Sequence, residues 1–144
     1  MLEQTLPADQ ANWLRFKITH ADLTESTANT AQAIDLCPVA VGDVVLDVLY
    51  HMPVAFQDAS DAAFNSTTLS LGDGASATAL QTAKELNVNG TEILTARTAT
   101  GKAYPAADTL KATFGSMSGK SLSNIDAGEV HIFVLLFQAA KKVG

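Results

Sequence analysis

The sequence predicts a mainly β protein, an antiparallel β-sandwich or jelly-roll-like single domain with one short helix and an N-terminal arm. Several short segments either alternate between apolar and polar residues or are rich in β-branched residues, which is typical of strands. Turn-forming Gly, Pro, Asn and Asp residues separate these segments at roughly regular spacing. A length of 144 residues suits one domain that buries a core without disulfides or metals.

The N-terminal region divides into two parts. Residues 1–12 show no sustained period and predict an extended arm, so the sandwich domain is expected to occupy residues 13–144. Residues 13–19 alternate and place Leu14, Phe16 and Ile18 on one face. This pattern predicts a half-exposed strand at the edge of a sheet.

Two further strands are expected before the middle of the chain. Residues 31–36 form a strand candidate, and Pro38 disfavours a ladder position after it. Gly42 and Asp43 then turn the chain into residues 44–52, a β-branched run that ends at Pro53. Such a run predicts a central strand.

The middle of the chain predicts a strand followed by the one helix. In residues 67–71, Leu69 and Leu71 share a face, and the Gly72-Asp73-Gly74 turn ends the strand. In residues 78–86 the apolar positions recur at helical spacing, which predicts a short helix that stops near Asn87.

The last third predicts two well-defined strands. Residues 91–98 are expected to extend and residues 101–106 to turn, before Leu110, Ala112 and Phe114 alternate in a strand. Residues 129–137 are apolar on both faces, so this strand is expected to lie buried between other layers.

Composition argues against several functional classes. Nine basic residues against fifteen acidic ones give a formal charge of -6, and the basic residues are scattered, so no nucleic-acid footprint is expected. No stretch approaches the roughly 18 apolar residues that a membrane helix needs, and no signal peptide is recognisable. Cys37 is the only cysteine, which excludes an internal disulfide.

One motif resembles a nucleotide site. Residues 72–77 fit the G-x-G-x-x-A dinucleotide fingerprint, and Glu92 follows about 20 residues later. However, the preceding strand alternates with polar residues instead of being buried on both faces, and Asp73 would repel a pyrophosphate. A tight turn is the better interpretation.

Other candidate sites are also incomplete. Residues 114–121 resemble a phosphate loop, but Phe114 stands where the first glycine is required, so a flexible hairpin loop is expected. The histidines are far apart in the sequence, which disfavours zinc, and a strand histidine is expected at His131. The acidic turn residues are expected to be solvated instead of binding calcium; these residues are Asp58, Asp61 and Asp73. We therefore expect no catalytic residues, no metal and no cofactor, and hence no enzyme.

The order of elements from residue 40 to residue 138 resembles the head-decoration, or capsid cement, proteins of tailed bacteriophages, of the small β-sandwich type. The resemblance rests on the sequence of the elements, with no single specific motif. Its parts are the glycine turn into the long strand (42–48), Phe56, the Leu71-Gly72-Asp73-Gly74 turn, residues 80–86, Tyr104-Pro105 with the following residues to Leu110, Leu122 and residues 127–132.

This resemblance implies a structural virion protein. Such a protein is made in the cytoplasm of the bacterial host, docks on the exterior of the assembled head through the major capsid protein, stabilises the capsid, and is often a homotrimer. Candidate partner contacts are Leu2 and Leu6 in the arm and Trp13 and Phe16 on the edge strand. Alternatively, Phe16 belongs to the core and Trp13 to the rim.

Three other functions remain open on the sequence. A head-fibre, tail or connector subunit of a phage would share the β-rich composition. A carbohydrate-binding module could use Trp13, Tyr50 and Tyr104 as stacking platforms. A nucleotide-dependent enzyme would depend on the turn at residues 72–77.

Overall fold

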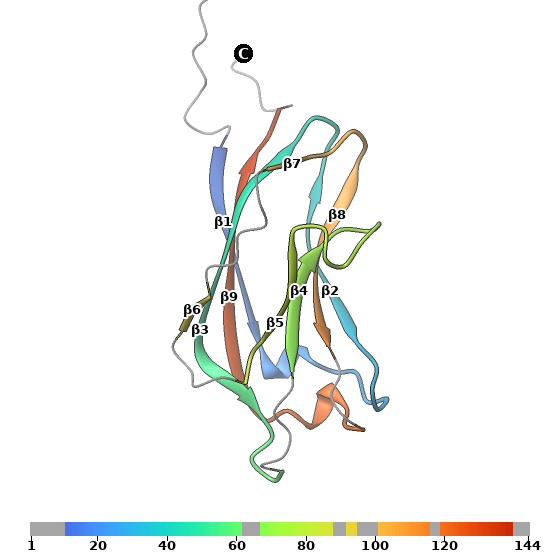
Figure 1. Ribbon diagram of the computed structural model, residues 1–144, viewed down its shortest axis with the longest axis vertical. Coiled ribbons are helices and arrows are strands. Elements are labelled where there is room, and N and C mark those ends of the chain that lie inside the picture. Colours follow the sequence, from blue (N-terminus) through green and yellow to red (C-terminus); the bar gives the residue numbers. More distant parts are fainter. Residues whose placement is uncertain (1–10, 62–66, 88–91, 95–100, 116–118, 140–144) are drawn as a thin grey trace, which may run out of the picture.

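Two antiparallel β-sheets stack face to face and form an elongated sandwich (Figure 1). The computed structural model describes residues 11–61, 67–87, 92–94, 101–115 and 119–139. The first sheet has the strand order β1-β9-β3-β6, with β7 also paired to β3, and the second has the order β2-β8-β4-β5. The predicted antiparallel sandwich is confirmed.

In the first sheet, β9 is held between two long partners. It pairs with β1 from Ala11↔Phe137 to Thr19↔Glu129 and with β3 along most of its length. The expected edge strand and central strand are therefore β1 and β3. The strands of this sheet are β1 (Ala11–Thr19), β3 (Val44–Gln57), β6 (Glu92–Leu94), β7 (Lys102–Ala103) and β9 (Ala127–Phe137).

The second sheet is built around β8, which pairs with β2 on one side and β4 on the other. Its strands are β2 (Gln32–Val39), β4 (Thr68–Gly72), β5 (Gln81–Glu85) and β8 (Asp108–Gly115). Two short 3-10 turns, η1 (His20–Asp22) and η2 (Leu122–Asn124), are the helical elements of the described residues. Within that part of the chain, no helix has the length and apolarity to cross a membrane.

The helix expected over residues 78–86 is wrong, because this segment contains the strand β5. The amide of Leu80 donates to the carbonyl of Leu71, and the amide of Leu86 donates to the carbonyl of Thr67. These bonds tie both ends of the segment to β4, and the two leucines are buried while residues 82–85 are exposed. Tertiary pairing thus overrides the local helical spacing.

Both prolines that were expected to end strands lie within them. β3 continues past Pro53 to Gln57, because a register irregularity between His51 and Val54 removes the proline from the ladder. Pro38 lies in β2, an edge strand on which the missing amide need not face a partner. At the N-terminus, β1 begins at Ala11, two residues before the expected boundary, and residues 1–10 lie outside the described residues.

The core lies between the two sheets. The rings of Phe56 and Phe114 meet from opposite sheets with their centroids 5.7 Å apart. In β8 the expected alternation is confirmed, since Leu110, Ala112 and Phe114 are all fully buried. The largest fully buried side chains also include Tyr50, Met52, Leu69, Leu71, Leu86, Leu122, Ile132 and Val130.

The expectation that β9 is buried on both faces is wrong. Its residues alternate strictly between buried and half-buried, with Val130, Ile132 and Val134 pointing into the core. The opposite face of β9 is apolar from Phe133 to Phe137 and carries Glu129 and His131 before that, and it has no second layer over it in the described part of the chain.

Gly128 shows how closely the Phe56 side chain of the neighbouring strand β3 packs over the start of β9. Its φ is +147°, and a Cβ atom there would lie 2.4 Å from the Phe56 ring. Gly119 also has a positive φ, of +81°, but a Cβ atom there would meet nothing within 4 Å. Substitutions at these two glycines therefore distinguish the cost of backbone strain alone, at Gly119, from the cost of strain plus steric overlap, at Gly128.

We predict that Gly128→Ala lowers the free energy of unfolding by about 3 kcal/mol or more, because backbone strain and overpacking against Phe56 add together. Gly119→Ala should cost only about 1 kcal/mol, since it carries the backbone term alone. Urea unfolding followed by far-UV circular dichroism measures both. Equal losses in the two variants would contradict the close contact at Phe56.

Candidate protein-binding surfaces

The outward face of the first sheet carries an apolar stripe centred on β9. Register places Trp13 beside Leu135, and both Arg15 and Leu49 beside Phe133. Trp13 has 48% of its surface exposed, and the other apolar members are half-buried. We call this surface the β9 face, and its apolar residues are Trp13, Leu49, Phe133, Leu135 and Phe137.

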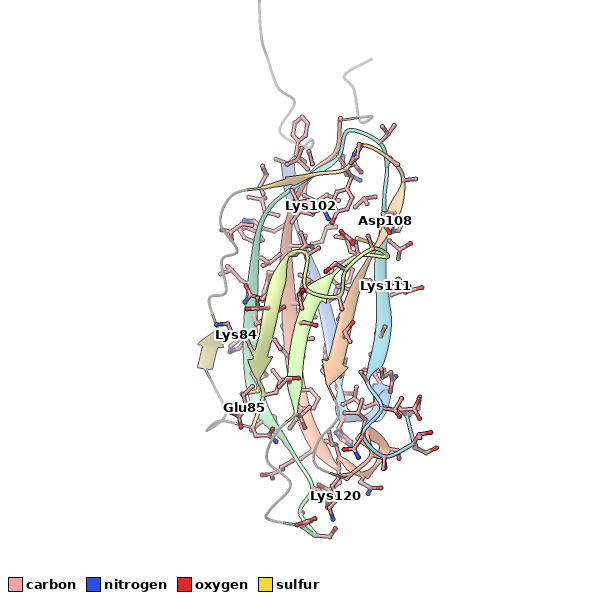
Figure 2. All side chains as sticks on the ribbon, turned by 45° about the vertical axis from the view of Figure 1, so that its right-hand side comes forward. Lys84, Glu85, Lys102, Asp108, Lys111 and Lys120 are labelled. Carbon is pink, nitrogen blue, oxygen red and sulfur yellow. The ribbon has the colours of Figure 1, made fainter. Side chains whose placement is uncertain are left out.

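The outward face of the second sheet is polar by contrast. In β8 the residues that alternate with the buried core positions are Thr109, Lys111 and Thr113. Figure 2 shows Lys84 and Glu85 toward one side of this sheet and Lys111 toward the other, so charged groups are spread across it. The two faces of the sandwich therefore differ in character, and the β9 face is the more apolar of the two.

Polar side chains border the β9 face at its far end. The rings of His51 and His131 lie 5.9 Å apart on neighbouring strands. His131 Nε2 is 2.8 Å from a Glu129 carboxylate oxygen, and Lys17 Nζ is 3.1 Å from the same oxygen. The hydrogen bonds with His131 and Lys17 lower the pKa of Glu129. His131 is thus a hydrogen-bonded strand histidine, as expected.

No metal centre is present among the residues that the structure describes. Their His, Cys, Asp and Glu side chains include no group of three that could hold an ion. His20 lies in η1, away from the register that joins His51 to His131.

A groove runs along the open edge of the sandwich between β1 and β2. Its volume is about 440 Å³, and both strands are edge strands whose outer backbone groups have no ladder partner in the described part of the chain. Such edges can accept an added strand. The groove is lined by Arg15, Phe16, Lys17, Ile18, Asp22, Ile34, Asp35 and Leu36.

The four residues expected to contact a partner do not form one cluster. Trp13 points outward on the β9 face, whereas Phe16 points inward, packs against the core and lines the groove. The alternation of β1 already separates residues 13 and 16, because side chains one or three positions apart point to opposite sides. Leu2 and Leu6 lie outside the described residues.

The glycine turn after β4 is an internally bonded structural turn. Asp73 Oδ1 accepts hydrogen bonds from the amides of Ala75 and Ser76, each at 3.0 Å. A Cβ atom at Gly72 would lie 2.0 Å from the Ser76 carbonyl oxygen, so only glycine fits. Because Asp73 already occupies the amides that a phosphate would need, the tight-turn interpretation holds.

The same aspartate joins the turn to the opposite sheet. Lys102 Nζ lies 2.6 Å from Asp73 Oδ2, and the Tyr104 hydroxyl donates to that oxygen at 3.1 Å. Burial raises the pKa of Asp73, but the bonds from Lys102, from the two amides and from Tyr104 outweigh it and lower the pKa overall. Asp73 is only 4% exposed, so its expected solvation is wrong.

The remaining motifs also have structural roles. Asp58 is 8% exposed and accepts hydrogen bonds from Ser60, which corrects its expected solvation, and Asp61 forms an ion pair with Lys120. In the segment that resembled a phosphate loop, residues 116–118 lie outside the described residues. The Gly119 amide there donates to the side chain of Asn29.

Comparison with known proteins identifies a fold relative. A chain described as part of the cyanophage Pam1 capsid asymmetric unit superposes with a TM-score of 0.66 and 18% sequence identity. The match covers 96% of this chain and 93% of the Pam1 chain. No protein-family model matches the sequence, and no curated protein matches it. The two chains therefore share the sandwich fold over nearly their full lengths.

We predict that Asp73→Asn lowers the free energy of unfolding by about 1–3 kcal/mol at pH 7, because a buried ionic acceptor is lost. A carboxylate whose pKa is lowered by folding stabilises the protein above its unfolded pKa, and this stabilisation disappears as the pH falls through the folded value. The difference between wild type and variant should therefore shrink below about pH 4 in urea unfolding measured from pH 7 to pH 3.

Asp35→Asn is the matched control. Asp35 forms an ion pair with Lys111 but keeps 70% of its side chain exposed, so its loss should cost less than about 1 kcal/mol at any pH. An Asp73→Asn deficit that persists unchanged at pH 3 would contradict a stabilising role for the Asp73 charge.

Proposed function

We propose that this protein is a non-enzymatic virion protein that binds the exterior of an assembled phage head and stabilises it. The observation that carries the proposal is the near-complete likeness in fold to a chain of the Pam1 capsid asymmetric unit. Because 93% of the Pam1 chain is covered, the likeness extends over nearly that whole chain.

The groove between β1 and β2 is the surface that we assign to the capsid protein. It combines apolar walls with two unpaired strand edges, a combination that suits an extended protein segment. Arg15 and Lys17 on β1, Asp22 in η1 and Asp35 on β2 place charges of both signs along the groove and can fix the orientation of such a segment. Weak contacts of this kind suffice on a lattice, because linked contacts act at high effective concentration.

Residues 1–10 are the second part of this proposed contact. They lead directly into β1, and hence start from the strand that forms one wall of the groove. Leu2 and Leu6 would lie on the same side of an extended segment, because side chains four residues apart in a strand share a face. Both could then enter apolar sites on the capsid protein.

The structure weighs against two alternative functions. Tyr50 is fully buried and Tyr104 is 3% exposed, so of the three aromatic side chains a sugar-binding module would need, only Trp13 is accessible. The enzyme alternative would require the turn amides that Asp73 occupies. A head-fibre, tail or connector role uses the same fold, and copy number separates it from decoration.

The proposal is tested by mixing the purified protein with expanded empty heads of its source virus, sedimenting the heads and counting bound copies per capsid subunit. We expect saturation at a fixed ratio that matches a repeated lattice position. Binding of a few copies per particle would instead support a fibre or connector subunit. No binding to the expanded heads would overturn the proposal.

We predict that Leu2→Ala combined with Leu6→Ala weakens head binding by at least about 10-fold, because burial of each leucine contributes about 1.5–3 kcal/mol. Sedimentation at several protein concentrations gives the dissociation constant. Thr5→Ala is the control, since residue 5 would point to the other side of an extended segment. Equal affinity of the leucine variant and wild type would remove the N-terminal segment from the contact.

A further inference from the structure

We propose that two copies of this chain pair through their β9 faces, about a two-fold axis that runs along β9. This pairing can be measured on the free protein, and its centre, Phe133 and Leu135, lies outside the groove, although Arg15 and Lys17 border both surfaces. The composition and charge of the β9 face favour a second copy of this chain as its binding partner.

The β9 face exposes large apolar side chains on a regular strand surface. Trp13 is 48% exposed at one side of the face, and Leu46, the extra residue at the register shift of β3, is 45% exposed. Between them, Phe133 and Leu135 form the centre, and Leu49, His51 and Phe133 border a hollow of about 300 Å³. A contiguous apolar surface of this kind on a small domain is typical of a protein interface.

Charge identifies a second copy as the partner. The chain carries a net charge of -6, so most of its surface would repel another copy. The charged residues in the register of the β9 face are Arg15 and Lys17 against Asp47 and Glu129, two of each sign, and therefore sum to zero. The face itself therefore adds no net charge repulsion between two copies.

The arrangement of these charges selects the symmetry axis. In a two-fold dimer both copies use the same surface, so a residue that contacts a given residue of the other copy is contacted in the same way by its own counterpart. With the axis along β9, the β1 strand of one copy lies over β3 of the other, so Arg15 comes within one residue pair of the partner copy's Asp47. With the axis across the strands, β1 would lie over β1, and this strand carries the basic residues Arg15 and Lys17 but no acidic residue. Opposite charges thus favour the first axis.

The same axis also brings the apolar centre together. Phe133 and Leu135 lie on β9 itself, so each meets its own symmetry mate at the axis. Face-to-face sheets keep their strands within about 30° of each other, which lets the two rows of side chains interdigitate. The polar face of the second sheet then remains outward in both copies.

The pairing is tested by sedimentation velocity of the full chain over a range of concentrations, together with tryptophan emission. The chain has one tryptophan, Trp13, which lies on the β9 face, so its emission should shift to shorter wavelength as dimers form. Leu135→Lys should weaken pairing at least about 30-fold, as expected for the centre of an interface. Thr113→Lys places the same cation on the opposite face and should leave the dimer unchanged.

A charge-swap series tests the axis itself. Arg15→Asp and Asp47→Arg should each weaken pairing about 10-fold, and the double variant should restore it, because opposite charges again meet across the axis. The restoration also shows that the double variant is folded. Weakening by both single changes without rescue would overturn the axis, and a trimer, which the sequence resemblance implies, would overturn the two-fold pairing.

A chain that stays monomeric at all concentrations, with unchanged Trp13 emission, would overturn the inference as a whole. Failure of the proposed function has a different signature. In that case the dimer forms in solution but the protein does not bind the heads. If the Leu135→Lys variant is monomeric and still saturates the heads, pairing and head binding use different surfaces.

Discussion

The fold depends on the alternation of side chains along β9, because this strand pairs with two neighbouring strands and also fills part of the core. Pairing with β1 and β3 fixes β9 in the middle of its sheet, so every second side chain points at the other sheet. Val130, Ile132 and Val134 fill the core on that side, and Gly128 leaves room for the Phe56 ring. Of the intervening side chains, Phe133, Leu135 and Phe137 are also apolar and are held outward by the same geometry. The strand β9 therefore contributes side chains both to the core and to the β9 face.

Much of the fold follows from local patterns. The alternation of β1 and β8 and the β-branched run of β3 predict the strands that form most of the two sheets. The errors arise where a distant partner decides the outcome. Residues 78–86 have helical spacing, but β4 offers unpaired backbone groups that the segment satisfies as a strand. Pro53 is tolerated because a bulge removes it from the ladder, which no local signal reveals.

The candidate surfaces were predictable to different degrees. The alternation of β1 is enough to show that Trp13 and Phe16 face opposite sides. The apolar run of β9 is visible in the sequence, but a strand that is buried on both faces and a strand that displays one apolar face look the same there. The groove could not be predicted, because it requires that β1 and β2, the edge strands of two different sheets, lie along the same open side. Nor does the sequence show that Asp73 bonds to Lys102 across the sandwich.

The pairing of β1 with β9 also affects how the chain acquires its structure. These are the first and last strands of the described residues, and they run in register from Ala11↔Phe137 to Thr19↔Glu129. During synthesis, β1 therefore has no ladder partner in the described part of the chain until residues 129–137 have left the ribosome. Contacts over such a sequence separation close slowly. The incomplete chain meanwhile exposes a strand edge, so newly made chains are vulnerable to mispairing with one another until β9 arrives.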